Sequence, residues 1–344
     1  MKKIAFYDAK PYDKIWFEKL KGNYDFEFKY FENHLNSDTA PLASKCEGVV
    51  AFVNDTIDAK TIDVLFENNI KVIAMRCAGY NNVDFKEAFE KIHVLRVPAY
   101  SPYAVAEHAI ALLLTLNRKI HRAYNRTRDN NYNINGLTGF DLHGKTAGVI
   151  GTGKIGRVFI DICKGFGMRV LAYDPHPAND ETIEFVSLEE LFAKSDIISL
   201  HCPLTKSTNH IINEQSLSQM KDGVVIINTS RGALIDSEAL LNAIKSQKVG
   251  AAGLDVYEEE SDLFFEDFSN SILQDDILAR LVSMPNVIIT SHQAFLTNEA
   301  LENIARTTLD NLKAFFDGGK LINEVCYQCQ KGEVCDKKHQ KPCF

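Results

Sequence analysis

The chain has 344 residues, a length that predicts two domains at roughly 100–200 residues each. Hydrophobic residues make up 45% and charged residues 24%, which is typical of a folded globular protein and excludes a disordered chain or a fibre. The net charge of -8 disfavours binding to nucleic acids or anionic membranes. The N-terminus lacks an apolar stretch of signal-peptide length, and the most apolar run, 104–116, is too short to span a bilayer. We therefore expect a cytoplasmic protein with reduced cysteines.

The first hundred residues alternate short Val- and Ile-rich runs with longer amphipathic stretches, the pattern of a parallel sheet with helical crossovers. This pattern predicts strands at 3–8, 48–53, 71–76 and 93–98, and helices near 11–20, 59–67 and 82–89. One long helix is predicted from 101 to about 128, with Pro102 in its first turn. A loop containing Gly and Asn follows at 130–144.

A second series of strands is predicted at 146–151, 169–174, 196–201, 224–229, 251–255 and 287–291, with helices between most of them. The helical stretch 298–317 is too long to be only a cap on this second sheet, so we expect the chain to return to the first domain there. The predicted fold class is α/β, with two doubly wound parallel-sheet domains. The predicted boundaries are 1–100 plus 293–330 for one domain, 101–292 for the other, and 326–344 for a Cys-rich tail.

Three glycines, Gly151, Gly153 and Gly156, follow a predicted strand and open a predicted helix, which is the context of the dinucleotide-binding fingerprint. The first permits a tight turn, the second lets the backbone approach a pyrophosphate, and the third allows close packing of helix on strand. The N–H groups at the start of the helix bind phosphate. Asp174 ends the next predicted strand, where a carboxylate accepts hydrogen bonds from ribose and repels a 2′-phosphate. The motif therefore predicts a Rossmann domain that binds NAD rather than NADP.

A nucleotide domain beside a second α/β domain is typical of dehydrogenases, for which a 2-hydroxy acid is one substrate class. Arg231 follows a predicted strand, and its planar guanidinium suits a carboxylate. His292 follows another, and histidine gives and takes a proton near neutral pH. One of Glu258, Glu259 and Glu260 could pair with His292 and favour the imidazolium, although the spacing does not decide which. From spacing alone, an ordinary core or surface side chain is the favoured interpretation of each of these residues.

The segment 220–236, MKDGVVIINTSRGALID, is similar to the signature of the D-isomer-specific 2-hydroxyacid dehydrogenase family. Residues 1–325 resemble this family, most closely its D-lactate dehydrogenase branch. The resemblance implies that Arg231 binds the substrate and that His292 is the acid/base. Glu260, the fifth residue after Asp255, is then the carboxylate paired with that histidine.

The resemblance also implies a flavodoxin-like substrate-binding domain built from 1–100 and 293–330. Backbone N–H groups of Ala78 and Gly79 and the side chain of Tyr100 would contact the substrate there. Phe295 stands where many members have a small residue, so it narrows the pocket, and Phe52 lines it as well. Members usually dimerise through the NAD domain and the region 101–140. The residues expected at NAD are Gly151, Gly153, Lys154, Ile155, Gly156, Asp174, Pro203, Thr229, Ser230 and Asp255.

Together these features predict an enzyme that reduces pyruvate to D-lactate with NADH and acts as a homodimer or higher homo-oligomer. A larger 2-oxo acid, such as 2-oxoisocaproate or phenylpyruvate, is an alternative, because a few side chains set the volume of the pocket. An NAD-sensing, corepressor-like binding protein is an alternative of another class. The tail either binds structural zinc or is a plain reduced segment. Its possible ligands are Cys326, Cys329, Cys335, His339 and Cys343.

Overall fold

The computed structural model describes residues 1–259, 264–265 and 267–325. Contacts between residues divide the chain into two compact units. The first consists of Met1–Ser101 and the described residues from Thr297 onward, and the second is Pro102–Leu296 without the gaps named above. No helix in the part that the structure describes is long and apolar enough to cross a membrane.

The first unit contains a six-stranded sheet in the order β13-β5-β4-β3-β1-β2. All neighbouring strands are parallel except β13, which runs antiparallel to β5. Without β13 the order is that of flavodoxin-like folds. The strands are β1 Lys2–Phe6, β2 Phe26–Tyr30, β3 Gly48–Ala51, β4 Val72–Met75, β5 His93–Leu95 and β13 Glu324–Val325. The helices are α1 Pro11–Leu20, α2 Ala59–Glu67, α3 Phe85–Ala88 and α11 Asn298–Phe316, with 3-10 turns at Lys21–Asn23 and Ala40–Ala43.

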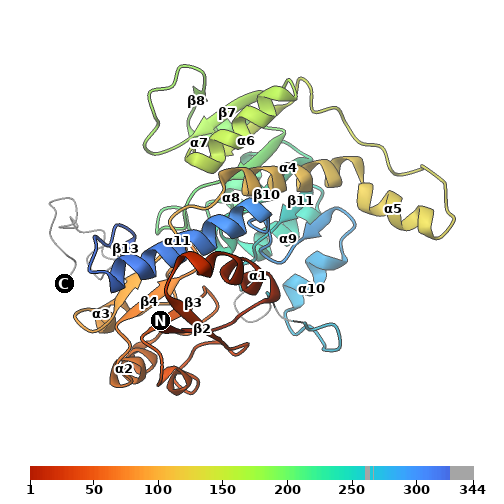
Figure 1. Cartoon of the computed structure of the whole chain (residues 1–344). Helices are drawn as coiled ribbons and strands as arrows, with labels where there is room; N and C mark the ends of the chain where they lie inside the picture. The colour runs from red at the N-terminus through yellow and green to blue at the C-terminus, as the bar shows by residue number, and fades with distance from the viewer. Residues whose placement is uncertain (260–263, 266, 326–344) are drawn as a thin grey trace. The chain divides into compact units, whose positions relative to one another are not determined.

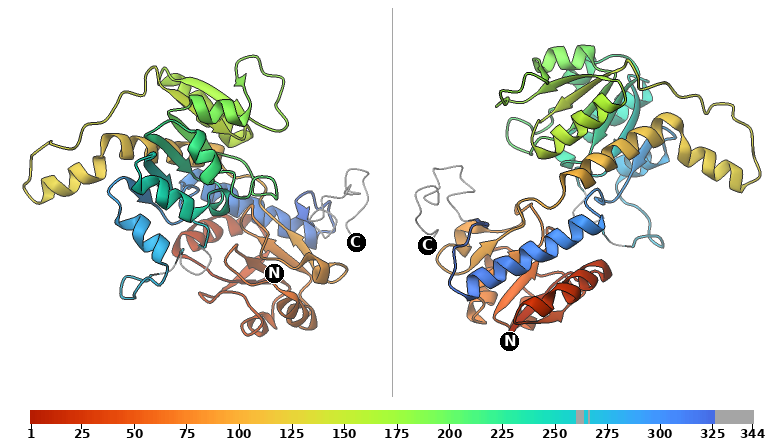
Figure 2. Two further views of the ribbon diagram at one scale, coloured as in Figure 1. Left: turned by 180° about the vertical axis from the view of Figure 1, so that it is seen from behind. Right: turned by 45° about the horizontal axis from the view of Figure 1, so that its top comes forward.

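Helix α11 comes from the end of the described chain and packs with α1 on one face of this sheet (Figure 2). Its buried side chains include Leu309 and Leu312, which join Phe6, Phe17 and Val50 in one apolar core. Such burial contributes about 25 cal/mol per Å² of apolar surface removed from water. This core explains why the chain returns to its first sheet after the second unit.

The second unit contains a seven-stranded, all-parallel sheet in the order β12-β11-β10-β9-β6-β7-β8. This is the Rossmann order with one further strand at the edge. Figure 1 labels β7, β8, β10 and β11 of this sheet. The strands are β6 Thr146–Ile150, β7 Arg169–Tyr173, β8 Glu184–Phe185, β9 Ile197–Leu200, β10 Val224–Asn228, β11 Val249–Leu254 and β12 Val287–Ile289. The helices are α4 Pro102–Arg118, α5 Ile120–Arg128, α6 Lys154–Gly165, α7 Leu188–Lys194, α8 Glu214–Gln219, α9 Ser237–Lys245 and α10 Asp276–Ser283, with a 3-10 turn at Gly232–Leu234. The predicted fold class is confirmed.

Some predicted elements differ from those in the structure. The single helix expected over 101–128 is wrong: it breaks at Lys119, whose φ of 50° is left-handed, and α5 begins in a new direction. Lys119 Nζ donates to the carbonyl of Thr138, 2.7 Å away, so the break is tied to the following loop. Strands β2, β8 and β13 were not predicted. Strand β2 is an aromatic edge strand, and the other two are only two residues long.

Candidate active site

The predicted cofactor and catalytic residues of the second unit follow the carboxyl ends of its strands. The glycine turn follows β6 and Asp174 follows β7, while Arg231, Asp255 and His292 follow β10, β11 and β12. Because all seven strands are parallel, these positions lie along one edge of the sheet. In open α/β sheets, ligands bind at this edge.

The glycine turn has the geometry that the motif predicts. Gly151 has φ +96°, and a Cβ there would lie 2.6 Å from the carbonyl oxygen of His201. A Cβ on Gly156 would lie 2.0 Å from the Gly151 carbonyl oxygen, so helix and turn touch through backbone alone. A Cβ on Gly153, in contrast, would meet no atom of the described residues within 4 Å. Open space at Gly153 fits the role of the second glycine of the motif, which lets the backbone approach a pyrophosphate.

Helix α6 begins directly at this turn, with Gly153 as its N-cap. No side chain caps the helix, so the first N–H groups, those of Lys154 and Ile155 among them, are available to a ligand. Aligned N–H groups and the positive end of the helix dipole favour phosphate.

Asp174 is bound to the same turn. Its Oδ2 accepts hydrogen bonds from the N–H and the hydroxyl of Thr152, at 2.8 and 2.9 Å, and its Oδ1 accepts from the N–H of His176 at 2.9 Å. Burial by itself raises the pKa of Asp174, but these hydrogen bonds outweigh it and hold the pKa below its ordinary value. The carboxylate is therefore charged at neutral pH, as selection against a 2′-phosphate requires.

Three further predicted cofactor residues lie after β9 and β10. The Thr229 hydroxyl is buried and has no hydrogen-bond partner among the described residues. The Ser230 hydroxyl donates to the carbonyl of Leu200 at 2.8 Å, and Pro203 is exposed. An unpartnered buried hydroxyl at this edge suits a polar ligand. NAD fits this set: the glycine turn would hold its pyrophosphate, Asp174 its ribose, and Thr229 a polar group farther along.

Arg231 lies on a turn fixed by a buried side chain. Asn228 Oδ1 accepts the N–H of Ser230 at 3.0 Å, and Asn228 Nδ2 donates to the Arg231 carbonyl at 2.8 Å. Gly232 is needed here, because a Cβ on it would lie 2.0 Å from the carbonyl carbon of Tyr257. The Arg231 turn thus packs against the segment that follows β11, while its partly buried guanidinium donates to the Ser230 carbonyl.

His292 is held in a left-handed conformation, with φ +52°. Such a conformation costs a non-glycine residue about 1–3 kcal/mol, and it persists only where the surroundings fix it. Its N–H donates to the carbonyl oxygen of Asp255 at 2.7 Å, and its ring lies 5.8 Å from that of Phe265 between centroids. Phe295, three residues on, is buried.

The three glutamates after β11 differ in their surroundings. Glu258 Oε1 lies 2.5 Å from His210 Nε2, and its Oε2 accepts the N–H of Ser237 at 3.3 Å. Glu258 is thus engaged by another histidine, and Glu259 is exposed. Glu260 lies outside the described residues, so its pairing with His292 stays a prediction.

The predicted substrate residues of the first unit follow two of its strands, Ala78 and Gly79 after β4 and Tyr100 after β5. Arg96 Nη1 donates to the carbonyl of Ala78 at 2.9 Å, and Cys77 Sγ lies 3.2 Å from the carbonyl oxygen of Gly79. Among the described residues, neither Ala78 nor Gly79 donates its N–H to another protein group. These groups are therefore available to a carboxylate. The carbonyl of Tyr100 accepts from Asn303 at 2.8 Å.

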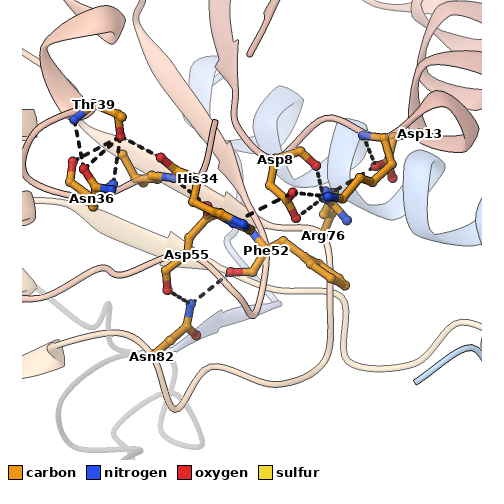
Figure 3. Close-up of polar contacts among 11 residues, drawn as sticks. Asp8, Asp13, His34, Asn36, Thr39, Phe52, Asp55, Arg76 and Asn82 are labelled. Carbon is orange, nitrogen blue, oxygen red and sulfur yellow. Dashed lines mark hydrogen bonds and ion pairs between the residues drawn. The ribbon is translucent and has the colours of Figure 1, made fainter. Parts of the chain in front are cut away.

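A buried charge cluster supports this part of the first unit (Figure 3). Arg76 Nη2 donates to the carbonyl of Asp8 at 2.6 Å, and lies 3.3 Å from Asp8 Oδ2 and 3.5 Å from Asp13 Oδ2. Burial alone lowers the pKa of Arg76, but the neighbouring carboxylates, Asp13 foremost, raise it overall. The guanidinium is therefore charged, and it precedes Cys77 in the chain.

The same cluster fixes Phe52. The Arg76 guanidinium carbon lies 3.9 Å from the centre of the Phe52 ring, a cation–π contact. Asp55 Oδ2 accepts the Phe52 N–H at 2.6 Å, and Asn82 Nδ2 donates to the Phe52 carbonyl at 2.9 Å. Burial raises the pKa of Asp55 to about 6, against the N–H bonds from Phe52 and Leu35 that lower it. Phe52 is thus held at both backbone groups and at its ring.

Sequence reasoning missed three polar residues behind the site. His201 follows β9, where burial lowers its pKa to about 3, and its Nε2 pairs with Ser199 Oγ at 2.9 Å. His108 lies on α4, and Thr290 follows β12. A histidine within the mostly apolar run 104–116 is the one signal in the sequence that could have identified His108.

In the described ranges, no group of three or more His, Cys, Asp or Glu side chains could hold a metal ion. The predicted tail ligands, Cys326, Cys329, Cys335, His339 and Cys343, lie outside these ranges.

A dinucleotide turn of this kind at the carboxyl edge of a Rossmann sheet is typical of NAD-binding domains, and the comparisons with known proteins identify the chain as an NAD-dependent oxidoreductase. A family model described as the D-isomer specific 2-hydroxyacid dehydrogenase NAD binding domain matches residues 110–294. The chain belongs to the D-isomer specific 2-hydroxyacid dehydrogenase family.

Known proteins similar to this chain bear the same kind of name. A D-lactate dehydrogenase of Escherichia coli is 53% identical over 94% of this chain and 99% of that protein. The structure of the apo D-lactate dehydrogenase from Escherichia coli has a TM-score of 0.87, at 50% identity over 94% of this chain and 99% of that chain. A structure of D-2-hydroxyisocaproate dehydrogenase has a TM-score of 0.84, at 33% identity over 94% and 99%.

Proposed function

We propose that this protein reduces pyruvate to D-lactate with NADH. The observation that carries the proposal is the 53% identity, over nearly the full length of both chains, to a protein named D-lactate dehydrogenase. The buried Phe295 just after His292 agrees with a small substrate, because a large aromatic side chain there takes up volume that a longer substrate needs.

In this proposal the first unit binds the substrate and the second binds NAD. The free N–H groups of Ala78 and Gly79 and the guanidinium of Arg231 bind the pyruvate carboxylate. Phe52, Tyr100 and Phe295 line the rest of the substrate site. The predicted domain boundaries, 1–100 plus 293–330 and 101–292, correspond to these two roles.

The reaction needs one hydride and one proton for each carbonyl group reduced. NADH, when bound, supplies the hydride to the carbonyl carbon and leaves as NAD. The His292 imidazolium donates the proton to the carbonyl oxygen and becomes neutral. Arg231 holds the carboxylate so that the carbonyl faces this acid, and Glu260 favours the imidazolium before the transfer.

A larger 2-oxo acid is the second candidate substrate class. Its support is the similarity to the D-2-hydroxyisocaproate dehydrogenase structure. The two candidates differ in the volume they need beside Phe295, and one methylene group changes discrimination by about 1–3 kcal/mol.

The test is NADH oxidation by the purified enzyme with pyruvate, 2-oxoisocaproate and phenylpyruvate, followed by chiral analysis of the product. We expect the highest kcat/KM with pyruvate, and D-lactate as the product. His292→Ala should lower kcat by roughly 10²–10⁴, the contribution of a general acid. Arg231→Lys should mainly raise the KM for pyruvate, because lysine lacks the bidentate guanidinium.

A higher kcat/KM with 2-oxoisocaproate or phenylpyruvate than with pyruvate would favour the second candidate, a larger 2-oxo acid. L-lactate as the product, or full activity in His292→Ala, would overturn it. The exposed residue His143 is the matched control. His143→Ala also removes an imidazole, but at a position away from the segments that follow β10, β11 and β12.

A further inference from the structure

A partly buried series of hydrogen bonds joins helix α4 to the turn that carries His292. His108 Nε2 lies 3.1 Å from Thr290 Oγ1, which lies 2.6 Å from Asp255 Oδ1. The same His108 nitrogen is 3.4 Å from that carboxylate oxygen. Asp255 is 0% exposed and the side chain of His108 only 18%, so this chain is largely shielded from water.

The donors in this chain have one possible order. An ionised carboxylate only accepts hydrogen bonds, so the single hydroxyl proton of Thr290 points to Asp255. Thr290 Oγ1 must then accept a hydrogen bond from His108, whose Nε2 carries a hydrogen. His108 therefore donates to Thr290, Thr290 donates to Asp255, and Asp255 is the final acceptor.

Asp255 in turn holds three consecutive N–H groups. Its backbone carbonyl accepts the N–H of His292 at 2.7 Å. Its carboxylate accepts the N–H of Gln293 at 2.9 Å through Oδ1 and that of Ala294 at 2.8 Å through Oδ2. The carbonyl bond fixes His292 itself, and the two carboxylate bonds fix the backbone of the two residues after it, so the conformation of this turn depends in part on the rotamer of Asp255.

We propose that His108 and Thr290 are positioning residues for the reaction. They fix the carboxylate of Asp255, and through it the turn that aims the imidazole of His292. Neither residue needs to touch substrate or cofactor for this effect. The inference rests on the proposed role of His292 as the proton donor.

Two pairs of variants test the chain. Thr290→Val removes the hydroxyl and keeps the shape, while Thr290→Ser keeps the hydroxyl. His108→Leu removes the donor, while His108→Gln places an amide N–H near the position of Nε2. We expect Thr290→Val and His108→Leu to lower kcat with pyruvate by about tenfold or more, and the Ser and Gln variants to recover most of it. The KM for NADH should change by less than about twofold in all four.

Glu107→Gln, on the exposed side of the same helix, is the matched control and should behave as wild type. Equal kcat values in Thr290→Val and Thr290→Ser would overturn the proposal. It would also be overturned if kcat fell only together with NADH affinity, because the effect would then act on the cofactor. Should His108→Leu fail to fold, the Thr290 pair still decides.

A second measurement does not depend on turnover. Hydrogen exchange at the N–H groups of 292–294 should be faster in Thr290→Val than in Thr290→Ser. Equal exchange would overturn the positioning chain even in an active enzyme. If wild type reduces no 2-oxo acid, the proposed function fails, and the exchange rates still test the chain by themselves.

Discussion

The glycine turn holds the side chain of Asp174 in place beside the predicted NAD site. Its hydrogen bonds with Thr152 keep the carboxylate next to the glycine turn, and they lower its pKa. A carboxylate with a lowered pKa keeps its charge as the pH falls. A 2′-phosphate placed beside this charge is repelled, while a ribose hydroxyl is not.

We therefore expect kcat/KM to favour NADH over NADPH, and Asp174→Asn to reduce that ratio by about tenfold or more. Asparagine keeps the size of the side chain and removes only its charge. The preference of wild type should persist down to about pH 5, because the Asp174 carboxylate is still ionised there. Glu181→Gln, which changes an exposed carboxylate in the following loop, is the control. Equal use of both cofactors by wild type would contradict the role of Asp174.

At the scale of the element, glycine is expected at the three positions of the turn for different physical reasons. Gly151 needs its positive φ and has no room for a Cβ, whereas Gly153 has φ -66° and open space around it. Gly151→Ala should thus strain the apo protein, while Gly153→Ala should leave it intact. Only a bound pyrophosphate would meet the added methyl group of Gly153→Ala.

The expected result is a split between stability and affinity. Gly151→Ala should lower Tm by several degrees, the consequence of about 1–3 kcal/mol of strain and contact. Gly153→Ala should keep Tm within about one degree of wild type and weaken NADH binding by about tenfold or more. Thermal unfolding and fluorescence titration with NADH measure the two effects. Normal NADH affinity in a folded Gly153→Ala would show that the pyrophosphate does not approach this residue.

Elements with a strong pattern could be predicted from the sequence. Helices α1 and α2 and the Val-rich strands were found because their apolar spacing is regular, and because α1 begins with Pro11 and α2 follows the N-cap residue Asp58. The break at Lys119 could not be predicted, because a lysine has no intrinsic preference for a left-handed φ. It depends on the bond from Lys119 to the loop at Thr138.

The candidate site was predictable where function follows strand ends. Arg231 follows strand β10 and His292 follows strand β12, so both residues lie at the carboxyl edge of the same parallel sheet. The residues behind them were not predictable, since His108 and Thr290 meet only through tertiary packing of α4 on the sheet. A side chain that acts through another residue is not marked by a motif or a regular spacing in the sequence.

At the scale of the whole molecule, helix α5 and the loop after it form an arm of the second unit, and apolar side chains of this arm are not buried in the core of that unit. Helix α5 has no buried residue, and in Figure 1 it lies apart from the sheet of its unit. Ile120 and Tyr124 on α5 are 54% and 57% exposed, and Tyr132 and Ile134 in the next loop 72% and 78%. A set of apolar side chains this exposed marks an interaction surface. We propose that a second copy of the chain covers it, as the resemblance to family dimers implies.

The purified protein should then have twice the mass of one chain in size-exclusion chromatography with light scattering. Tyr124→Asp combined with Ile134→Asp should shift it toward the monomer at micromolar concentration, because each carboxylate would be buried unpaired in the interface. Ile15→Asp places the same charge at an equally exposed apolar position of the first unit and should leave the mass unchanged. A monomeric wild type, or a folded double variant with the wild-type mass, would contradict an interface at this arm. Circular dichroism of each variant separates loss of the interface from loss of the fold.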